Sequence, residues 1–221
     1  MFVGLLDAAA PAGDTSQPEL LFRAVDSLID ALRASLDFNA PVVVCGCGGG
    51  TALGEVLPAL LAHAPWLVLD ADALNAIARD VQAGNALLQA RAVRGWATVL
   101  TPHPLEAARL LSRSTAQIQA NRLAAAQQLV DHFGCVVLLK GSGTVIAAPG
   151  ELTVLNPTGT ARLATASTGD VLAGMVGAGL AASRSAFDAA CAAVYRHGLM
   201  ADEWPNGVAL TAGALALAWA V

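Results

Sequence analysis

Charged residues are scarce in this chain, and positively charged residues are nowhere concentrated. Only 13% of the 221 residues are charged, with 12 Lys or Arg against 17 Asp or Glu and a net charge of −5. A nucleic-acid-binding surface needs a basic patch or stripe, so we expect no nucleic-acid partner. Hydrophobic residues make up 56% of the chain, which excludes the polar, charge-rich composition of disordered proteins. The composition favours a single domain, residues 1–221, with a substantial core.

The chain also lacks a long hydrophobic segment and a secretory signal. Its longest uncharged, mainly apolar run covers residues 207–221, whereas a membrane-spanning helix needs about 20 apolar residues. Residues 1–13 contain Asp7 and no basic residue, unlike the start of a secretory signal peptide. We therefore predict no membrane association, a cytoplasmic location, and a buried C-terminal helix within residues 207–221.

The four cysteines do not follow a metal-binding pattern. Cys45 and Cys47 alternate on one predicted strand, Cys135 and Cys191 are distant in sequence, and no cluster of Cys and His follows. Structural zinc sites need closely spaced ligand pairs, so no metal ligands are predicted among the side chains. Buried, reduced thiols are the simplest interpretation.

Short apolar runs alternate with longer helical patterns along the chain. Near-continuously apolar strands separated by helices predict a three-layer α/β/α domain with a mostly parallel sheet. Pro149 and Gly150 form a turn signal that predicts a β-hairpin, and helices follow it to the C-terminus. The predicted strands are residues 41–45, 66–70, 98–101, 135–140, 144–147 and 151–155; the predicted helices are residues 18–34, 53–62, 73–78, 104–111, 115–133, 168–182, 186–201 and 211–220.

Glycines and polar residues gather where the predicted strands end, in residues 46–50, 70–75, 101–106 and 140–144. Ligands of open α/β sheets bind outside the carboxyl ends of the strands. The four strand ends therefore predict one composite site.

A loop of small residues meets an apolar helix within residues 156–174. The unpaired N–H groups and the dipole at a helix N-terminus favour an anion, so Gly169 would allow a phosphate to approach the backbone closely. Asp170 would then lie where a carboxylate can accept the proton of an attacking hydroxyl. An ordinary helix start is the alternative, with Ser167 or Thr168 as the N-cap and Asp170 complementing the dipole.

Five stretches carry a resemblance to a known family. They are ATASTGDVLAG (164–174), LDADALN (69–75), LTPHPLEAARL (100–110), LLKGSGTVI (138–146) and GCGGG (46–50), and together they cover roughly residues 40–221. In order and spacing they resemble the segments of the ADP/ATP-dependent NAD(P)H-hydrate dehydratases, which belong to the ribokinase-like superfamily. The resemblance implies a ribokinase-like fold and a repair reaction, in which the hydroxyl of hydrated NADH or NADPH is phosphorylated and phosphate is then lost.

The resemblance also implies roles for particular residues. Asp170 would be the base, with Thr168 and Gly169 completing the catalytic group, and Mg²⁺ would bridge the phosphates of ADP or ATP. It assigns nucleotide binding to Lys140, Gly141, Ser142, Gly143, Thr144, Thr160, Ala164, Thr165, Ser167, Thr168 and Gly169. It assigns binding of the NAD(P)H hydrate to Gly48, Gly50, Asp72, Asn75, His103, Pro104, Glu106, Arg109 and Asp170. A homo-oligomer and a separate NAD(P)H-hydrate epimerase in the same pathway are the partners it implies.

Several of these residues have structural alternatives. Asp70 and Asp72 could cap the following helix, with Asn75 bonding the loop. His103 could be an exposed loop residue, and Lys140 could be solvated at a strand end. Glu106 and Arg109, three positions apart, could form an ordinary surface pair.

The sequence departs from the family pattern in three places. The family's domain opens with a strand, a glycine-rich turn and a helix before the region where residue 1 starts. Residues 4–7 are predicted to correspond to the second strand of that domain. Without the opening elements, a sheet edge or a core face would be exposed. Ala166 and Ser167 replace two glycines, which would strain the backbone if φ is positive there. Residues 46–50 lack the family's proline and leucine. A small-molecule kinase of the same superfamily and an inactive nucleotide-binding relative are therefore the competing hypotheses.

Overall fold

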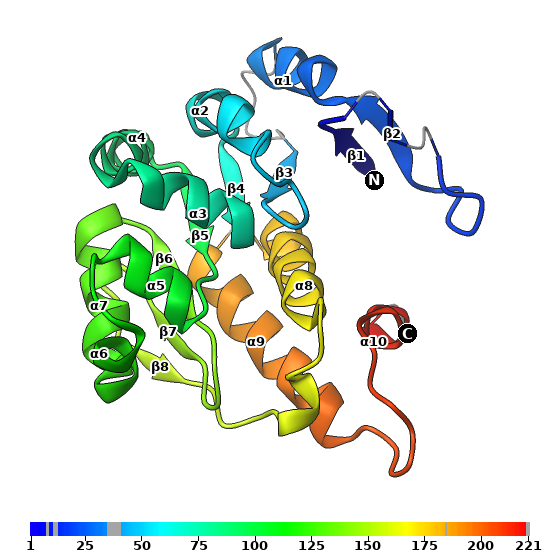
Figure 1. Cartoon of the computed structure of the whole chain (residues 1–221), viewed down its shortest axis with the longest axis vertical. Coiled ribbons are helices and arrows are strands. Elements are labelled where there is room, and N and C mark those ends of the chain that lie inside the picture. The colour runs from blue at the N-terminus through cyan, green and yellow to red at the C-terminus, as the bar shows by residue number, and fades with distance from the viewer. Residues whose placement is uncertain (8, 11–12, 35–40, 184, 220–221) are drawn as a thin grey trace.

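The computed structural model describes residues 1–7, 9–10, 13–34, 41–183 and 185–219, which form two sheets and two layers of helices (Figure 1). In chain order the elements are β1 (Phe2–Leu5), β2 (Leu21–Ala24), α1 (Val25–Ala34), β3 (Val42–Cys45), α2 (Leu53–His63), β4 (Trp66–Leu69), α3 (Ala71–Arg79), α4 (Val81–Val93), β5 (Ala97–Leu100), α5 (Pro104–Leu110), α6 (Thr115–Ala120), α7 (Arg122–Phe133), β6 (Val136–Leu139), β7 (Val145–Ala147), β8 (Val154–Leu155), the 3₁₀ helix η1 (Ala161–Leu163), α8 (Thr168–Ser183), α9 (Ala186–Asp202) and α10 (Ala212–Trp219).

The larger sheet has six strands in the order β3-β4-β5-β6-β7-β8. Strands β3 to β6 run parallel, and β6, β7 and β8 pair antiparallel. The predicted parallel sheet and β-hairpin are thus present, although β8 has only two residues. All four parallel strands end at the same edge of the sheet, which brings the predicted strand-end loops together.

Both faces of the central strands β4, β5 and β6 are buried, because these strands send alternate side chains into two separate cores. Leu67 and Leu69 of β4 belong to one core with residues of α1 to α7, whereas Val68 belongs to a second core with residues of α8, α9 and α10. Figure 1 shows the helices α2 to α7 on one side of the sheet and α8 and α9 on the other. The three-layer α/β/α prediction is therefore correct.

Three parts of the helix prediction are wrong. Residues 18–34 do not form one helix, because Leu21–Ala24 forms strand β2, which pairs in parallel with β1, and the helix α1 begins only at Val25. Residues 115–133 are divided at Asn121, whose side chain accepts a hydrogen bond from the N–H of Ala124 and starts the new helix α7. The helix α4 was not predicted; the side chain of Asp80 caps it by accepting from the N–H of Ala83.

The two ends of the chain also differ from expectation. The predicted strand at residues 4–7 is instead β1, and it pairs with β2 in a separate two-stranded sheet. Strand β3 is the edge of the main sheet, where a cavity of about 740 Å³ lies between the N-terminal elements and β3.

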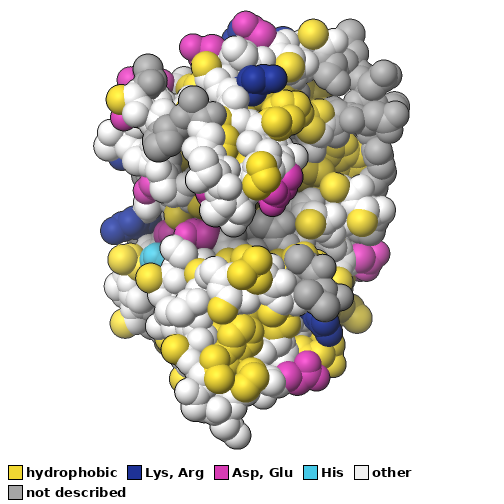
Figure 2. Space-filling model, turned by 90° about the vertical axis from the view of Figure 1, so that its right-hand side faces the viewer, with side chains coloured by type: hydrophobic (Ala, Val, Ile, Leu, Met, Phe, Trp, Pro, Cys, Tyr) yellow, Lys and Arg dark blue, Asp and Glu magenta, His cyan; other side chains and the backbone are white. Residues whose placement is uncertain are grey.

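The predicted buried C-terminal helix is only half buried. Leu215 of α10 is buried, but Leu217 is 71% exposed, because only one face of the helix packs on the core formed by α8 and α9. Residues 220 and 221 lie outside the described residues. Figure 2 shows patches of hydrophobic side chains on the face that carries β1, β2 and α10. Within the described residues, no helix combines the length and apolar character that a bilayer crossing requires.

Candidate functional site

A cavity of about 390 Å³ lies where the loop after β6 meets the N-terminus of α8 and the helix α9. Nine of the predicted nucleotide-binding residues line it: Lys140, Gly141, Ser142, Gly143, Thr144, Thr160, Ala164, Thr168 and Gly169. Thr165 and Ser167 are exposed and do not line it. The structure thus brings together residues that are up to 29 positions apart and that were predicted from two separate motifs.

The N-terminus of α8 is held by its first residue. Thr168 is buried, and its Oγ1 donates to the carbonyls of Leu163 at 2.6 Å and Thr165 at 2.9 Å. The Nε2 atom of His197, on α9, lies 3.0 Å from the carbonyl oxygen of Thr168. Burial lowers the pKa of His197 from its usual value, so the ring is neutral and donates to that carbonyl. His197 was not predicted, since a single histidine within a helical pattern gives no local signal.

Ser167 carries the strain that the sequence predicted for one of the two replaced glycines. Its φ is +64°, in the left-handed region that side chains disfavour, whereas Ala166 is not among the residues with positive φ. Gly169 follows two residues later, and a Cβ placed on it would lie 3.4 Å from the Nζ atom of Lys140. The helix start is therefore strained, and glycine leaves the ammonium group room beside it.

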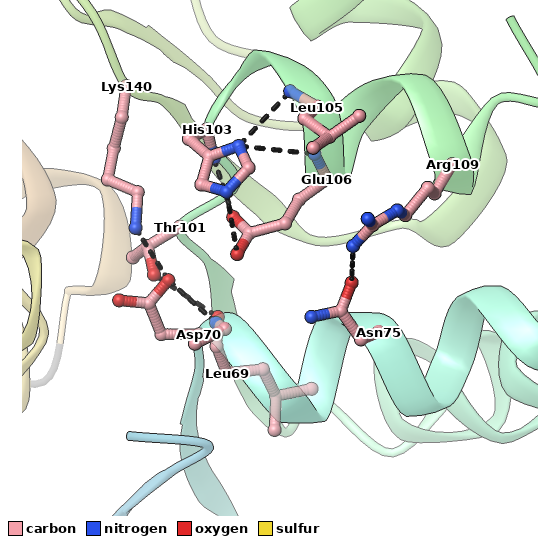
Figure 3. Close-up of polar contacts among 10 residues, drawn as sticks. Leu69, Asp70, Asn75, Thr101, His103, Leu105, Glu106, Arg109 and Lys140 are labelled. Carbon is pink, nitrogen blue, oxygen red and sulfur yellow. Dashed lines mark hydrogen bonds and ion pairs between the residues drawn. The ribbon is translucent and has the colours of Figure 1, made fainter. Parts of the chain in front are cut away.

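A buried ion pair lies next to this helix start. Lys140 Nζ is 2.6 Å from Asp70 Oδ1, and the Asp70 side chain is only 1% exposed (Figure 3). The same oxygen accepts from the N–H of Ala71, so Asp70 caps α3 as the structural alternative proposed. Lys140 is not a freely solvated residue, because its side chain is 18% exposed and paired.

Asp170 lies in the first turn of α8, half-buried, beside an unpredicted neighbour. One ligand atom each of Cys47, Asp70 and Asp170 lie within 4.8 Å of one another. Cys47 is exposed, so the expectation of buried thiols is wrong for this residue. Partial desolvation of its thiol, followed by the charges of Asp170 and Asp70 and a hydrogen bond to Asp170, raises the pKa of Cys47 to about 12. The thiol is therefore protonated and donates to the Asp170 carboxylate. Cys47 occupies the position of the proline in the family's loop, so this difference from the family could have indicated Cys47 as a neighbour of the site.

His103 is a helix cap in this structure. Its Nδ1 accepts from the N–H groups of Leu105 at 3.1 Å and Glu106 at 3.3 Å, while Glu106 Oε2 accepts from the N–H of His103 at 2.7 Å (Figure 3). The ring is part-exposed, and its Nε2 lies 3.3 Å from Glu106 Oε1. Burial raises the pKa of the Glu106 carboxyl. The alternative of an ordinary exposed loop histidine is therefore wrong, because the ring caps α5, while its contact with a ligand stays a prediction.

The other predicted substrate residues bond to one another across the loops. Asp72 Oδ2 accepts from the N–H of Gly50 at 2.8 Å, and Asn75 Oδ1 accepts from Arg109 (Figure 3). The alternative pair of Glu106 with Arg109 does not form, because each has a different partner.

Gly48 and Gly50 have φ values of +70° and +57° and are exposed at the edge of the sheet. Pro104 is half-buried at the first position of α5. None of these substrate residues lines the 390 Å³ cavity, so the two predicted sets occupy adjoining regions that meet at Asp70, Lys140 and Asp170.

Comparisons with known proteins agree with this arrangement. The family model of the NAD(P)H-hydrate dehydratases matches residues 12–219. An ADP-dependent (S)-NAD(P)H-hydrate dehydratase of Neisseria meningitidis is 43% identical over 201 residues, which cover 90% of this chain and 65% of that protein. The bifunctional NAD(P)H-hydrate repair enzyme Nnr of Escherichia coli is 40% identical over 190 residues, covering 85% of this chain and 34% of the enzyme. The chain therefore spans less than two thirds of these relatives.

Solved structures support the same assignment. The ADP/ATP-dependent NAD(P)H-hydrate dehydratase of Bacillus subtilis, co-crystallized with ATP/Mg²⁺ and soaked with CoA, is 28% identical with a TM-score of 0.69, covering 91% of this chain and 72% of that one. A ribokinase-like superfamily protein of Enterococcus faecalis, 23% identical with a TM-score of 0.72 over 91% of this chain and 68% of its own, shares the fold. The predicted ribokinase-like fold is thus confirmed, and the chain belongs to the NAD(P)H-hydrate dehydratase family.

Proposed function

We propose that this protein uses ADP or ATP to dehydrate hydrated NADH or NADPH and so restores the reduced nicotinamide. The observation that carries the proposal is Asp170 in the first turn of α8, beside the ion pair of Lys140 and Asp70 and next to the 390 Å³ cavity. The names of the relatives match this activity. A nucleotide in the cavity would present its terminal phosphoryl group to Asp170 and to a hydroxyl on the adjoining side.

The proposed chemistry has two steps. Asp170 accepts the proton of the ring hydroxyl, whose oxygen bonds to the terminal phosphorus while the bond to the nucleotide breaks. Phosphate then leaves the ester with the carbon–oxygen bonding pair as the ring nitrogen donates its lone pair to the carbon, and loss of a proton from the neighbouring carbon regenerates the double bond. Within the described residues the N–H of Gly169 has no protein acceptor, so it can stabilise the charge on the transferring group. The N–H of Thr168 donates to the carbonyl of Thr165 at 3.4 Å, so Thr168 would contribute by holding the start of α8.

The residues present fit a nucleotide and its Mg²⁺. The absence of a side chain at Gly169 leaves space beside the Lys140 ammonium group, and the cavity is lined by the glycine-rich loop at residues 140–144. Mg²⁺ prefers oxygen ligands and keeps several waters, and the carboxylates of Asp70 and Asp170 lie close enough to hold such waters. When bound, the ion would neutralise phosphate charge.

The substrate set is proposed in two parts. Asp72, Asn75 and Glu106 are engaged with other loop residues and would support the pocket. Gly48, Gly50, Pro104, Arg109 and the edge of the His103 ring remain exposed or half-exposed and would contact the hydrated dinucleotide.

The context of the activity is also proposed. A single-domain chain acting in the cytoplasm as a homo-oligomer, with a separate epimerase supplying the reactive epimer, fits a soluble cofactor as substrate. The bifunctional names of several relatives support the link to a second activity.

The test is a turnover assay with hydrated NADH, Mg²⁺ and either ADP or ATP, followed by the return of the absorbance of reduced nicotinamide. We expect recovery with the unaltered chain and a loss of at least about 10²-fold in Asp170→Asn, which keeps the shape and removes the base. Asp188→Asn is the matched control, because Asp188 is an exposed aspartate in the first turn of α9. Equal activity in both variants would refute the role of Asp170.

An inactive nucleotide-binding relative is the second candidate, and the strained φ of Ser167 favours it. It predicts measurable ADP binding with no recovery of reduced nicotinamide. A small-molecule kinase would instead accumulate a stable phosphorylated product, which mass spectrometry of the reaction would detect.

A further inference from the structure

One arginine side chain binds the glycine-rich loop at residues 140–144 from the side away from the cavity. Arg122 is the first residue of α7, and its NH1 donates to the carbonyl of Ser142 at 2.6 Å. Its NH2 donates to the carbonyl of Leu139 at 3.0 Å. The guanidinium group therefore connects the end of β6 to the middle of the glycine-rich loop.

Gly141 explains how the guanidinium group reaches this position. The φ of Gly141 is +145°, and a Cβ at that residue would lie 2.9 Å from NH2 of Arg122. A side chain would displace the arginine, so the glycine serves the contact with Arg122 as well as the turn. Burial lowers the pKa of Arg122, yet a guanidinium remains charged at neutral pH.

The position of Arg122 is unfavourable for its own helix. A cation in the first turn is repelled by the helix dipole, and the Nε atom of Arg122 is buried without a hydrogen-bond partner among the described residues. Its two charge-assisted bonds to loop carbonyls are the only side-chain hydrogen bonds that it makes within the described part of the chain. The interactions that offset these costs are thus those with the loop.

These bonds fix the direction of the loop's peptide groups. In a trans peptide the C=O and the N–H point in opposite directions, and no peptide bond here is cis. Because the carbonyl of Ser142 points at Arg122, the N–H of Gly143 points away from it. Across the described residues, the N–H groups of Gly141, Ser142 and Gly143 donate to no protein acceptor, and all three residues line the cavity.

We propose that Arg122 is a positioning residue for nucleotide binding, which acts from behind the loop and never touches the ligand. By holding the carbonyl of Ser142 on the far side, it keeps the N–H of Gly143 directed at the phosphates of a nucleoside diphosphate or triphosphate in the cavity. Its bond to the carbonyl of Leu139 anchors the loop to the end of β6. The proposal rests on the proposed function for the identity of the ligand. It predicts that loss of Arg122 weakens nucleotide binding more than it slows the chemical step. Within the described residues Arg122 makes no side-chain hydrogen bond to Asp170 or to the start of α8.

The experiment measures ADP binding to the full chain by calorimetry, together with KM and kcat where turnover occurs. We expect Arg122→Met to bind ADP about tenfold more weakly, because hydrogen bonds that order the loop are lost, with KM for the nucleotide raised and kcat little changed. Arg122→Lys keeps the charge and one donor direction, so it should be intermediate. Arg94→Met is the matched control, because Arg94 donates to the carbonyl of Ala62, away from the cavity.

The outcomes separate this proposal from the proposed function. A chain that binds ADP without turnover would contradict the proposed function, and the ADP affinity of Arg122→Met would still decide the role of Arg122. An unchanged affinity in Arg122→Met, with only a lower unfolding midpoint in urea, would overturn the proposal and leave Arg122 a structural residue. If Arg122→Met does not fold, Arg122→Lys decides in the same way. A native chain that binds no ADP would overturn both.

Discussion

The ion pair of Lys140 with Asp70 makes the most direct prediction about stability. The two side chains lie 70 positions apart in sequence, their charged atoms are 2.6 Å apart, and Asp70 is only 1% exposed. We consider three variants: Lys140→Met, Asp70→Asn, and the double variant. Each keeps the approximate size of the side chain and removes one charge or both.

The expected costs differ because the two partners are buried to different extents. Lys140→Met leaves a buried carboxylate with a hydrogen bond from the N–H of Ala71, and stranding such a charge costs about 3–5 kcal/mol. Asp70→Asn costs less, about 1–2 kcal/mol, since the new amide oxygen can still cap α3 and the Lys140 side chain is 18% exposed and can turn to solvent. The double variant should resemble Asp70→Asn, so the coupling energy equals the cost of Lys140→Met, about 3–5 kcal/mol.

Urea unfolding of the four chains at one pH and one salt concentration measures this coupling. An exposed ion pair contributes less than about 1 kcal/mol and weakens with salt. A coupling below about 0.5 kcal/mol would show that the carboxylate is hydrated in solution, which would contradict the burial on which the argument rests.

Three further predictions concern the start of α8 and its neighbours. Ser167→Gly should raise the free energy of unfolding by about 1 kcal/mol, because glycine adopts the φ of +64° without strain; an unchanged urea midpoint would show that the residue is relaxed. Burial depresses the pKa of His197 in the folded state below its usual 6.5, so the unfolded chain binds the proton first as pH falls. The contribution of His197 to the free energy of unfolding is complete above pH 6.5 and is lost as pH falls through the folded pKa. In His197→Gln, the free energy of unfolding measured in urea should therefore depend less on pH in this range. With its pKa raised to about 12, Cys47 should react with iodoacetamide more slowly than free cysteine near neutral pH, as followed by mass spectrometry. Modification of Cys47 should stop turnover, whereas turnover by Cys47→Ser should be insensitive to iodoacetamide. Fast labelling of Cys47 would mean that the thiol does not face the carboxylates.

The sequence predicted the central strands well because their signals are local. Strands β4, β5 and β6 are mainly apolar runs buried on both faces. Asp70 follows β4, Lys140 follows β6, and Thr101 and Pro102 follow β5. The strand β2 gave no such signal, since its four residues are LFRA and its conformation depends on pairing with β1. The helix break at Asn121 was hidden because the alanine-rich flanks favour a continuous helix. The break depends on the Asn121 side chain, which caps the new helix by accepting from the N–H of Ala124.

The site was predicted unevenly. Short motifs located the loops correctly, but they did not indicate which side chains bond to one another across them. One contact could have been predicted: the order His-Pro-Leu-Glu at residues 103–106 places glutamate three residues after a capping position, which is the pattern of a capping box. The contacts of Arg122 and His197 could not, because each side chain bonds to a main-chain carbonyl that is distant in sequence.

The predicted substrate residues form pairs for a physical reason. Polar side chains at the ends of parallel strands converge on one small region, and buried polar groups there must find partners before any ligand arrives. Asp72 with Gly50 and Asn75 with Arg109 each join two segments in this way, and Glu106 with His103 closes the start of α5. Replacing one member changes the shape of the pocket as well as its chemistry, so lost activity alone does not identify a ligand contact. Substitution of a residue that contacts the ligand should change the free energy of ligand binding by more than it changes the free energy of unfolding. Among these residues we expect the exposed Arg109 to meet that condition.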